Sequence, residues 1–132
     1  MKAYRFDFDV PYAHVDQMRV VYYANFLVYF EMARAALLRE AGISYRDMEA
    51  AGVMLPVVEA HCEYKQFARY EDRIIILSTC HPFKGPRLHI SYEVFRDQTL
   101  LTTGYTHHVC MSPEGRLLRP TPALLALCGD AT

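Results

Sequence analysis

One long, almost uniformly apolar helical pattern constrains this chain more than any other feature. It covers residues 22–41 and follows a polar segment that carries Asp16. At about 100° per residue, one arc of the helix is a row of apolar side chains, namely Phe26, Tyr29, Phe30, Ala33, Ala36, Leu37 and Ala41. The other faces are also largely apolar, and the clearly polar positions are Glu31, Arg34, Arg39 and Glu40. A helix of this kind is surrounded by protein, so we predict one central helix sheathed by the rest of the chain.

The rest of the chain mostly alternates apolar and polar residues with a period of two, which is typical of strands. The strand-like segments are residues 3–10, 57–67, 73–80, 88–95 and 100–111. A turn is expected at residues 82–86, and Gly104 is expected to mark a bulge or bend. Short helices are expected at residues 44–51, with Ser44 as the cap, and at 122–128, with Thr121 as the cap.

The connections between the four later strands are too short for crossover helices, so these strands are predicted to be mostly antiparallel neighbours. A single apolar helix and one curved antiparallel sheet have one economical arrangement, in which the five-stranded sheet wraps around the helix. The sequence therefore predicts the α+β class and a single domain, residues 1–132.

The charge balance excludes several classes of function. The chain has 14 basic and 15 acidic side chains and a formal net charge of −1, without a basic block for nucleic acid or an anionic membrane. Its longest apolar run, residues 20–30, is too short to span a bilayer, and the N-terminal segment lacks an apolar signal core. We therefore expect a cytoplasmic protein with no nucleic-acid partner and no membrane insertion.

Neither the cysteines nor the histidines follow a metal-binding spacing. The four cysteines form no C-x-x-C pair, and a disulfide framework is not expected without a secretion signal. The six histidines match no standard zinc pattern. We predict buried free thiols and no metal site.

Two stretches carry a resemblance to a known family. YAHVDQMRVVYYANFLVYFEMAR and LPVVEAHCEYKQFARYEDRI resemble the acyl-CoA thioesterases of the 4-hydroxybenzoyl-CoA thioesterase family, of which the Tol–Pal-associated thioesterases are a close branch. The resemblance spans about residues 3–120. It implies the hotdog fold, a homo-oligomer (a dimer or a tetramer of paired dimers) and an acyl-CoA substrate bound at the subunit interface. It implies no cofactor, because coenzyme A is part of the substrate.

The resemblance also implies site residues. The family's catalytic carboxylate matches Asp16, and the start of the following helix binds the thioester carbonyl. Tyr23 is the second candidate catalytic residue. It stands where one branch has histidine and the 4-hydroxybenzoyl-type branch often has tyrosine, which excludes a mechanism that needs that histidine. Arg19 stands where the family usually has glycine. We predict that its side chain points outward, toward a partner subunit or a coenzyme A phosphate, because burying a charge beside an acyl pocket is costly.

Thioester hydrolysis needs few groups. The thiolate leaves readily, so a carboxylate that attacks the carbonyl or activates water, together with donors for the oxyanion, is sufficient. Asp16 is the candidate carboxylate, and the N–H groups of residues 21–24 are the candidate donors if the helix begins near Tyr22. The alternative role for Asp16 is to cap the helix or a turn.

Further residues are assigned by type and position. We expect Tyr12 and Tyr22 to line the acyl pocket. Glu59 and His61 share a strand face, either as acid–base groups near the substrate or as a pair at a subunit interface. The turn that holds Lys84 and Arg87 is the best local cluster for the coenzyme A phosphates.

Two other functions remain open at this point. A hydratase or dehydratase acting on acyl thioesters would use a histidine–carboxylate pair, for which His14 and Asp16 are available. A non-catalytic acyl-CoA-binding protein would be favoured if Arg19 blocked the site.

Overall fold

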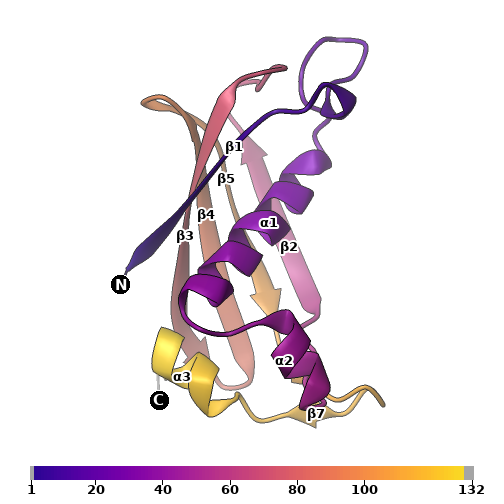
Figure 1. Ribbon diagram of the computed structural model, residues 1–132, viewed down its shortest axis with the longest axis vertical. Helices are drawn as coiled ribbons and strands as arrows, with labels where there is room; N and C mark the ends of the chain where they lie inside the picture. Colours follow the sequence, from indigo (N-terminus) through magenta and orange to yellow (C-terminus); the bar gives the residue numbers. More distant parts are fainter. Residues whose placement is uncertain (1, 130–132) are drawn as a thin grey trace.

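A five-stranded antiparallel sheet curves around helix α1 in the computed structural model, which describes residues 2–129 (Figure 1). The predicted α+β arrangement, with the sheet wrapped around one long helix, is confirmed. The elements are β1 (Ala3–Asp9), a 3-10 turn η1 (Tyr12–His14), α1 (Asn25–Glu40), α2 (Tyr45–Ala50), β2 (Val57–Tyr64), β3 (Arg73–Lys84), β4 (Arg87–Arg96), β5 (Thr99–His108), β6 (Cys110–Met111), β7 (Leu117–Leu118) and α3 (Pro122–Cys128).

The strand order in the sheet is β1-β3-β4-β5-β2. The later strands were predicted to be antiparallel neighbours, which holds for β3, β4 and β5, whereas β2 lies at the far edge beside β5. Residues 65–72 carry the chain from β2 to β3 past the start of α1, where the Val21 N–H donates to the Ala68 carbonyl at 2.8 Å. Strands β2 and β3 are consecutive in sequence, but β5 and β4 lie between them in the sheet.

The turn predicted at residues 82–86 is shorter than expected. Strand β3 continues through Pro82 to Lys84, and the turn itself is Gly85 with Pro86. Pro82 lies within a register shift between β3 and β4. A bulge is where a strand tolerates proline, because proline has no N–H for the ladder.

Gly104 does not mark the bulge that was predicted there. The register shift between β4 and β5 falls at Leu101, which is skipped in the pairing. A Cβ at Gly104 would lie 2.6 Å from Phe30 Cε2 and 2.4 Å from the His61 carbonyl oxygen, so glycine is required for the close approach of α1. The Phe30 ring stacks on Tyr92 with centroids 4.2 Å apart.

The core lies between α1 and the concave face of the sheet. It contains the large side chains Tyr29, Tyr92, Phe30, Phe83, Leu37, Leu38, Ile74, Ile76, Leu88, Ile90, Leu101 and Leu124, all fully buried. Two large apolar residues of α1 stay outside it, since Leu27 is 43% and Val28 45% exposed. The sheathing predicted for α1 is therefore incomplete within one chain. Among residues 2–129, no helix has the length and apolarity needed to cross a membrane.

Candidate active site

Asp16 lies in a tight hairpin that precedes α1. Val15 pairs with Val21, the Asp16 N–H donates to the Val20 carbonyl at 3.0 Å, and the Arg19 N–H donates to the Asp16 carbonyl at 2.9 Å. The Met18 N–H donates to Asp16 Oδ1 at 2.8 Å. Within residues 2–129, Oδ2 has no hydrogen-bond partner. Oδ1 thus stabilises the turn, which is the alternative role considered for Asp16. Oδ2 is free to act as a nucleophile or a base.

Arg19 adopts a backbone conformation that suits glycine. Its φ is 66°, in the left-handed region where a Cβ is crowded and which the last residue of a three-residue hairpin loop often adopts. Its side chain is exposed, consistent with the outward direction predicted for it. The position where the resembling family has glycine is therefore one at which glycine is favoured by backbone geometry.

We expect Arg19→Gly to raise the free energy of unfolding by about 0.5–1 kcal/mol, because the relief of left-handed strain exceeds the extra unfolded-state entropy of glycine. Urea denaturation of wild type and variant measures this change in the free energy of unfolding. The matched control is Arg39→Gly at an exposed site in the last turn of α1, which should instead lower stability by about 1 kcal/mol. A loss of stability in both variants would contradict the strain at Arg19.

Helix α1 begins later than the sequence predicted, and this changes the set of oxyanion donors. The helix starts at Asn25 rather than near Tyr22, because Val21 is held extended by the hairpin. The N–H groups of Val21 and Tyr22 are already used, donating to the Ala68 and His14 carbonyls at 2.8 and 3.0 Å.

Two of the predicted donors remain. Within residues 2–129, the N–H groups of Tyr23 and Ala24 have no acceptor. Both precede the first turn of α1, where the helix dipole favours negative charge.

Asp16 opens into an apolar hollow of about 240 Å³. Tyr22, predicted near the acyl group, and Tyr23, predicted as a catalytic residue, both line it. Its remaining walls are Met18, Val20, Val21, Phe26, Tyr64, Gln66, Phe67 and Ala68. Tyr64 was missed from the sequence, since it lies at the distant end of β2. Its hydroxyl donates to the Tyr23 carbonyl at 2.9 Å, and burial raises the pKa of Tyr64 above its usual value. The Tyr23 hydroxyl and, more weakly, the Asp16 charge raise the pKa of Tyr22.

Tyr12 lies on the other side of Asp16. It lines a broader hollow of about 850 Å³ that also contains Asp16, Arg19 and Tyr70. The Tyr12 and Tyr70 rings meet edge to face with centroids 5.3 Å apart. Asp16 is shared by both hollows, so the structure brings Tyr12, Tyr22, Tyr23 and Asp16 together.

The other predicted residues lie elsewhere in the chain. Glu59 and His61 are on the outer face of the sheet at the free edge of β2. Glu59 binds Tyr105 and Arg87 at 2.8 and 3.2 Å, and these bonds lower the pKa of the carboxyl. His61 instead lies 3.8 Å from Glu63. They share a face, as predicted, but within one chain they do not meet Asp16.

Lys84 and Arg87 lie at the β3–β4 turn, at the opposite end of the sheet from the Asp16 loop (Figure 1). The pairing puts Ile76 of β3 in line with Tyr64, and Lys84 is eight residues further on, roughly 26 Å along the strand. With three histidines, the two side chains line a hollow of about 440 Å³.

His14 does not form the pair with Asp16 that a hydratase would need. Its Nδ1 lies 2.9 Å from the Tyr29 hydroxyl, and its carbonyl accepts hydrogen bonds from the Tyr22 N–H and from Asn25. Among the residues that the structure describes, His14 and Asp16 share no hydrogen bond or ion pair.

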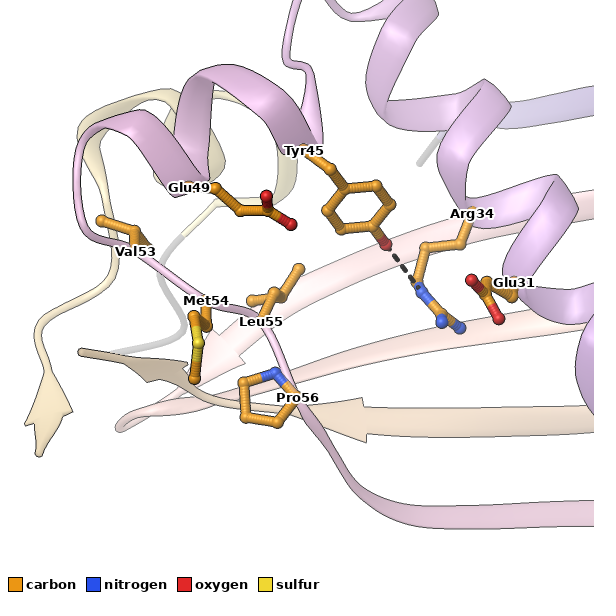
Figure 2. Close-up of a pocket in the computed structure, with 8 residues that line it drawn as sticks. All are labelled: Glu31, Arg34, Tyr45, Glu49, Val53, Met54, Leu55 and Pro56. Carbon is orange, nitrogen blue, oxygen red and sulfur yellow. Dashed lines mark hydrogen bonds between the residues drawn. The ribbon is translucent and has the colours of Figure 1, made fainter. Parts of the chain in front are cut away.

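A further hollow of about 450 Å³ lies between α1, α2 and the segment that leads into β2 (Figure 2). Arg34 projects into it although its side chain is only 7% exposed. Its Nε donates to the Tyr45 hydroxyl at 3.0 Å. Glu31 and Glu49 line the same hollow, but neither makes an ion pair with Arg34 within residues 2–129. The polar position predicted for Arg34 is thus a buried one.

A chain of hydrogen bonds continues from Arg34 into the core. Arg34 Nη1 donates to the Tyr92 hydroxyl at 3.2 Å, which lies 2.7 Å from Thr106 Oγ1. His108 Nε2 lies 2.8 Å from the same Oγ1, and its Nδ1 lies 3.2 Å from the Leu55 carbonyl. A carbonyl only accepts, so Nδ1 is the donor and Nε2 accepts from Thr106. The partners thereby fix one neutral tautomer of His108.

Comparison with known proteins places the chain in a family. It matches the Thioesterase-like superfamily over residues 10–126. A 1,4-dihydroxy-2-naphthoyl-CoA hydrolase of Rippkaea orientalis is 31% identical over 112 residues, covering 80% of this chain and 79% of that protein. The acyl-CoA thioester hydrolase YbgC of Escherichia coli is 28% identical over 111 residues, covering 83% of each.

A solved structure agrees with this assignment. Slr0204, a 1,4-dihydroxy-2-naphthoyl-CoA thioesterase from Synechocystis, has a TM-score of 0.90 and 25% identity, with 98% of each chain covered. The family match covers residues 10–126, and the structural match covers 98% of this chain, including its antiparallel sheet and long central helix. The protein therefore belongs to the thioesterase-like superfamily and has its hotdog fold.

Proposed function

We propose that this protein hydrolyses the thioester of a small acyl-CoA, with Asp16 as nucleophile or general base. The observation that carries the proposal is the site at the start of α1. There a carboxylate with one free oxygen shares an apolar hollow with Tyr23. Tyr23 bears one of two unused backbone N–H groups, and the other belongs to the next residue, Ala24.

The reaction follows from these groups. The thioester carbonyl oxygen accepts from the Tyr23 and Ala24 N–H groups, which stabilise the negative charge that develops during attack. Asp16 Oδ2 either removes a proton from the attacking water or attacks the carbonyl carbon itself. Coenzyme A leaves as the thiolate, which takes up a proton. When water attacks, the free acid forms directly, whereas attack by Asp16 leaves an acyl–aspartyl anhydride, which a water molecule then hydrolyses to the free acid and the Asp16 carboxylate.

The walls of the hollow favour a flat acyl group. Five of the eleven lining residues are aromatic, and the Tyr23 and Tyr64 rings meet edge to face with centroids 6.3 Å apart. Aromatic rings gain from such packing beyond their buried area. Relatives of this chain are named for a naphthoyl-CoA substrate, so we propose an aromatic acyl group in preference to a short aliphatic one.

A panel of acyl-CoA substrates with a thiol-detecting reagent tests the proposal. Benzoyl- and naphthoyl-type substrates should release coenzyme A with a higher kcat/KM than acetyl- or hexanoyl-CoA. Failure to release thiol from every member would overturn the thioesterase function, whereas faster release from the aliphatic members would overturn only the substrate class. After a single turnover in ¹⁸O-water, label found in Asp16 would identify the nucleophilic route.

We further propose that two copies associate through β2. This strand lies at the edge of the sheet and its residues are almost all exposed. Val57 and Val58 on β2, and Leu27 and Val28 on α1, are between 43% and 46% exposed. An edge strand with adjacent apolar surface is a template for pairing with another chain.

Light scattering tests this association. We expect a dimer or a tetramer of the 15.2 kDa chain, and Val28→Glu should shift it toward monomer because a charge cannot be buried unpaired there. The control is Leu117→Glu, at a residue that is also exposed (54%) but lies in β7. A wild-type monomer at micromolar concentration would contradict the prediction.

Pairing of β2 with β2 also bears on the remaining residues. An antiparallel pair related by a two-fold axis brings the β3–β4 end of one copy toward the Asp16 end of the other. In such a pair, Lys84 and Arg87 of the second copy are our candidates for the coenzyme A phosphates. Glu59 and His61, on the edge strand itself, become interface residues.

A further inference from the structure

The hollow between α1, α2 and the segment before β2 contains a buried cation without an anionic partner (Figure 2). The Arg34 side chain is buried, and its two acceptors, the Tyr45 and Tyr92 hydroxyls, are neutral. Within residues 2–129 it makes no ion pair. A buried charge is costly without an opposite charge beside it, so an anion that enters the hollow would stabilise the guanidinium.

Part of the guanidinium is free to donate to such an anion. Arg34 Nε and Nη1 each donate to a phenol, whereas Nη2 has no acceptor among the residues that the structure describes. Over the same part of the chain, Thr102 Oγ1 is the one side-chain polar atom that lacks a partner and is also sealed from solvent. Nη2 is therefore accessible from the space that Arg34 lines.

The Tyr45 hydroxyl is a second donor on the wall of this hollow. It accepts from Arg34 Nε at 3.0 Å, and its own O–H has no acceptor within residues 2–129. The Tyr92 hydroxyl, by contrast, donates to Thr106, because Thr106 itself donates to His108. The donors left for a ligand are therefore Arg34 Nη2 and the Tyr45 O–H.

The rest of the lining decides what kind of anion fits. The segment before β2 forms an apolar wall, made of Val53, Met54, Leu55 and Pro56. An apolar wall with a few convergent polar groups suits a small organic molecule better than an inorganic ion. Glu31 and Glu49 line the same hollow and are exposed. Their carboxylates would repel a second negative charge on the ligand.

We propose that this hollow binds a small organic monocarboxylate with an apolar body. The carboxylate accepts from Arg34 Nη2 and from the Tyr45 O–H, and the bond to the guanidinium is of the strong, charge-assisted kind. The apolar body lies against residues 53–56. Two kinds of molecule share this chemistry: a simple acid, and an amino acid whose ammonium group lies toward Glu31 and Glu49.

The proposed carboxylate site is separate from Asp16. Arg34 is nine residues after Asn25, roughly 14 Å along α1. The hollow at Arg34 shares no lining residue with the two hollows at Asp16. Failure of thioester hydrolysis would therefore leave this inference intact, and failure of carboxylate binding would leave the proposed hydrolysis intact.

Titration calorimetry on the full chain tests the proposal. The probes are 4-methylpentanoate and L-leucine, which have the same carbon skeleton and differ in the ammonium group, and acetate, which lacks the apolar body. We expect at least one of the first two to bind saturably with a Kd of about 1 mM or below. Acetate should bind about tenfold more weakly or worse, because it buries less apolar surface.

Variants locate the bound carboxylate. Tyr45→Phe removes one donor but keeps the ring, and should weaken binding about tenfold. Arg34→Gln should abolish binding, with a thermal melt to check the fold. Tyr4→Phe, on β1 and outside the hollow, is the matched control and should leave the Kd unchanged.

Glu49→Gln distinguishes the two kinds of ligand. It should tighten 4-methylpentanoate about twofold, because a repelling charge is removed, and weaken L-leucine by a similar factor, because the ammonium group loses a partner. The ligand that binds more tightly to the wild type is then assigned as a simple acid or an amino acid.

A carboxylate of a second copy is the competing partner for Arg34. Arg34 also lines a smaller hollow of about 280 Å³ beside Val57 of β2, where we propose that two copies associate. If that copy occupied the guanidinium, neither acid would bind to the folded protein, and this result would overturn the proposal. Binding that Tyr45→Phe and Arg34→Gln both leave unchanged would overturn it as well, because the acid would then lie at another site.

Discussion

Asp16→Asn is expected to lower kcat at least ~100-fold while the protein stays folded. Asparagine has the shape of aspartate, and its amide oxygen still accepts the Met18 N–H that fixes the turn. It is neither a nucleophile nor a base, however, so this side chain can no longer attack the thioester or take a proton from water. Thiol release from the best acyl-CoA of the panel measures kcat, and a thermal melt checks the fold.

Asp97→Asn is a matched control for this variant. Asp97 lies in the turn between β4 and β5, is exposed and also has a positive φ, 53°. Its conversion to asparagine should leave kcat unchanged, so an effect of Asp16→Asn cannot be ascribed to replacing a turn aspartate in general. Near-normal turnover by Asp16→Asn would remove Asp16 from the mechanism and make Glu59, at the free edge of β2, the next candidate.

The second large expected effect is a loss of stability at acid pH, caused by the buried imidazole of His108. Burial first, and then the nearby Arg34 charge, lower the pKa of this imidazole to about 4, whereas in the unfolded chain it is about 6.5. As the pH falls through this window, the unfolded state takes up a proton that the folded state does not, so the free energy of unfolding falls. The shift corresponds to about 3 kcal/mol, lost between about pH 6.5 and 4.

Urea unfolding at several pH values between 7 and 4 measures this loss. His108→Gln should flatten the dependence on pH, because a glutamine amide can donate to the Leu55 carbonyl and accept from Thr106 without titrating. Carboxyl groups such as Glu59, whose pKa is lowered in the fold, add their own acid loss to both proteins, so the two curves are compared by their difference. His61→Gln, at an exposed histidine, is the control. Parallel curves for wild type and His108→Gln would refute the assignment.

The sequence predicted those parts of the fold that depend on local chemistry. The period of the apolar residues distinguished helix from strand, and Thr121 with Pro122 located α3 at its observed residues. Ser44 likewise caps α2, accepting from the Asp47 N–H at 3.0 Å. These signals operate within a few residues of the element that they define, so one sequence is enough to read them.

Features that depend on distant contacts were not predicted. The start of α1 was placed too early because Val21 is held extended by Val15 and Ala68, and an apolar pattern does not reveal such pairing. The burial of Arg34 depends on two phenols, Tyr45 and Tyr92. Neither is a neighbour in sequence, and both replace the carboxylate that a buried cation normally needs.

The residues of the candidate site also fall into those that the sequence identified and those that only distant contacts bring together. Asp16 was identified through a family resemblance, and the hairpin that presents its free oxygen is local. Tyr64 reaches the same hollow from the end of β2, and the pairing register alone brings it there. The sequence suggested Lys84 and Arg87 by charge, but their distance from Asp16 along the sheet depends on strand length and turn position.

The free edge of β2 has a consequence for how the protein can be produced. Within residues 2–129 no strand covers its outer side, and apolar side chains lie beside it. The unpaired edge of β2 in a newly folded chain can therefore bind an incompletely folded copy as readily as a folded one. The yield of refolded protein should therefore be highest at an intermediate protein concentration. At low concentration two folded chains rarely meet to pair, and at high concentration unfolded chains aggregate.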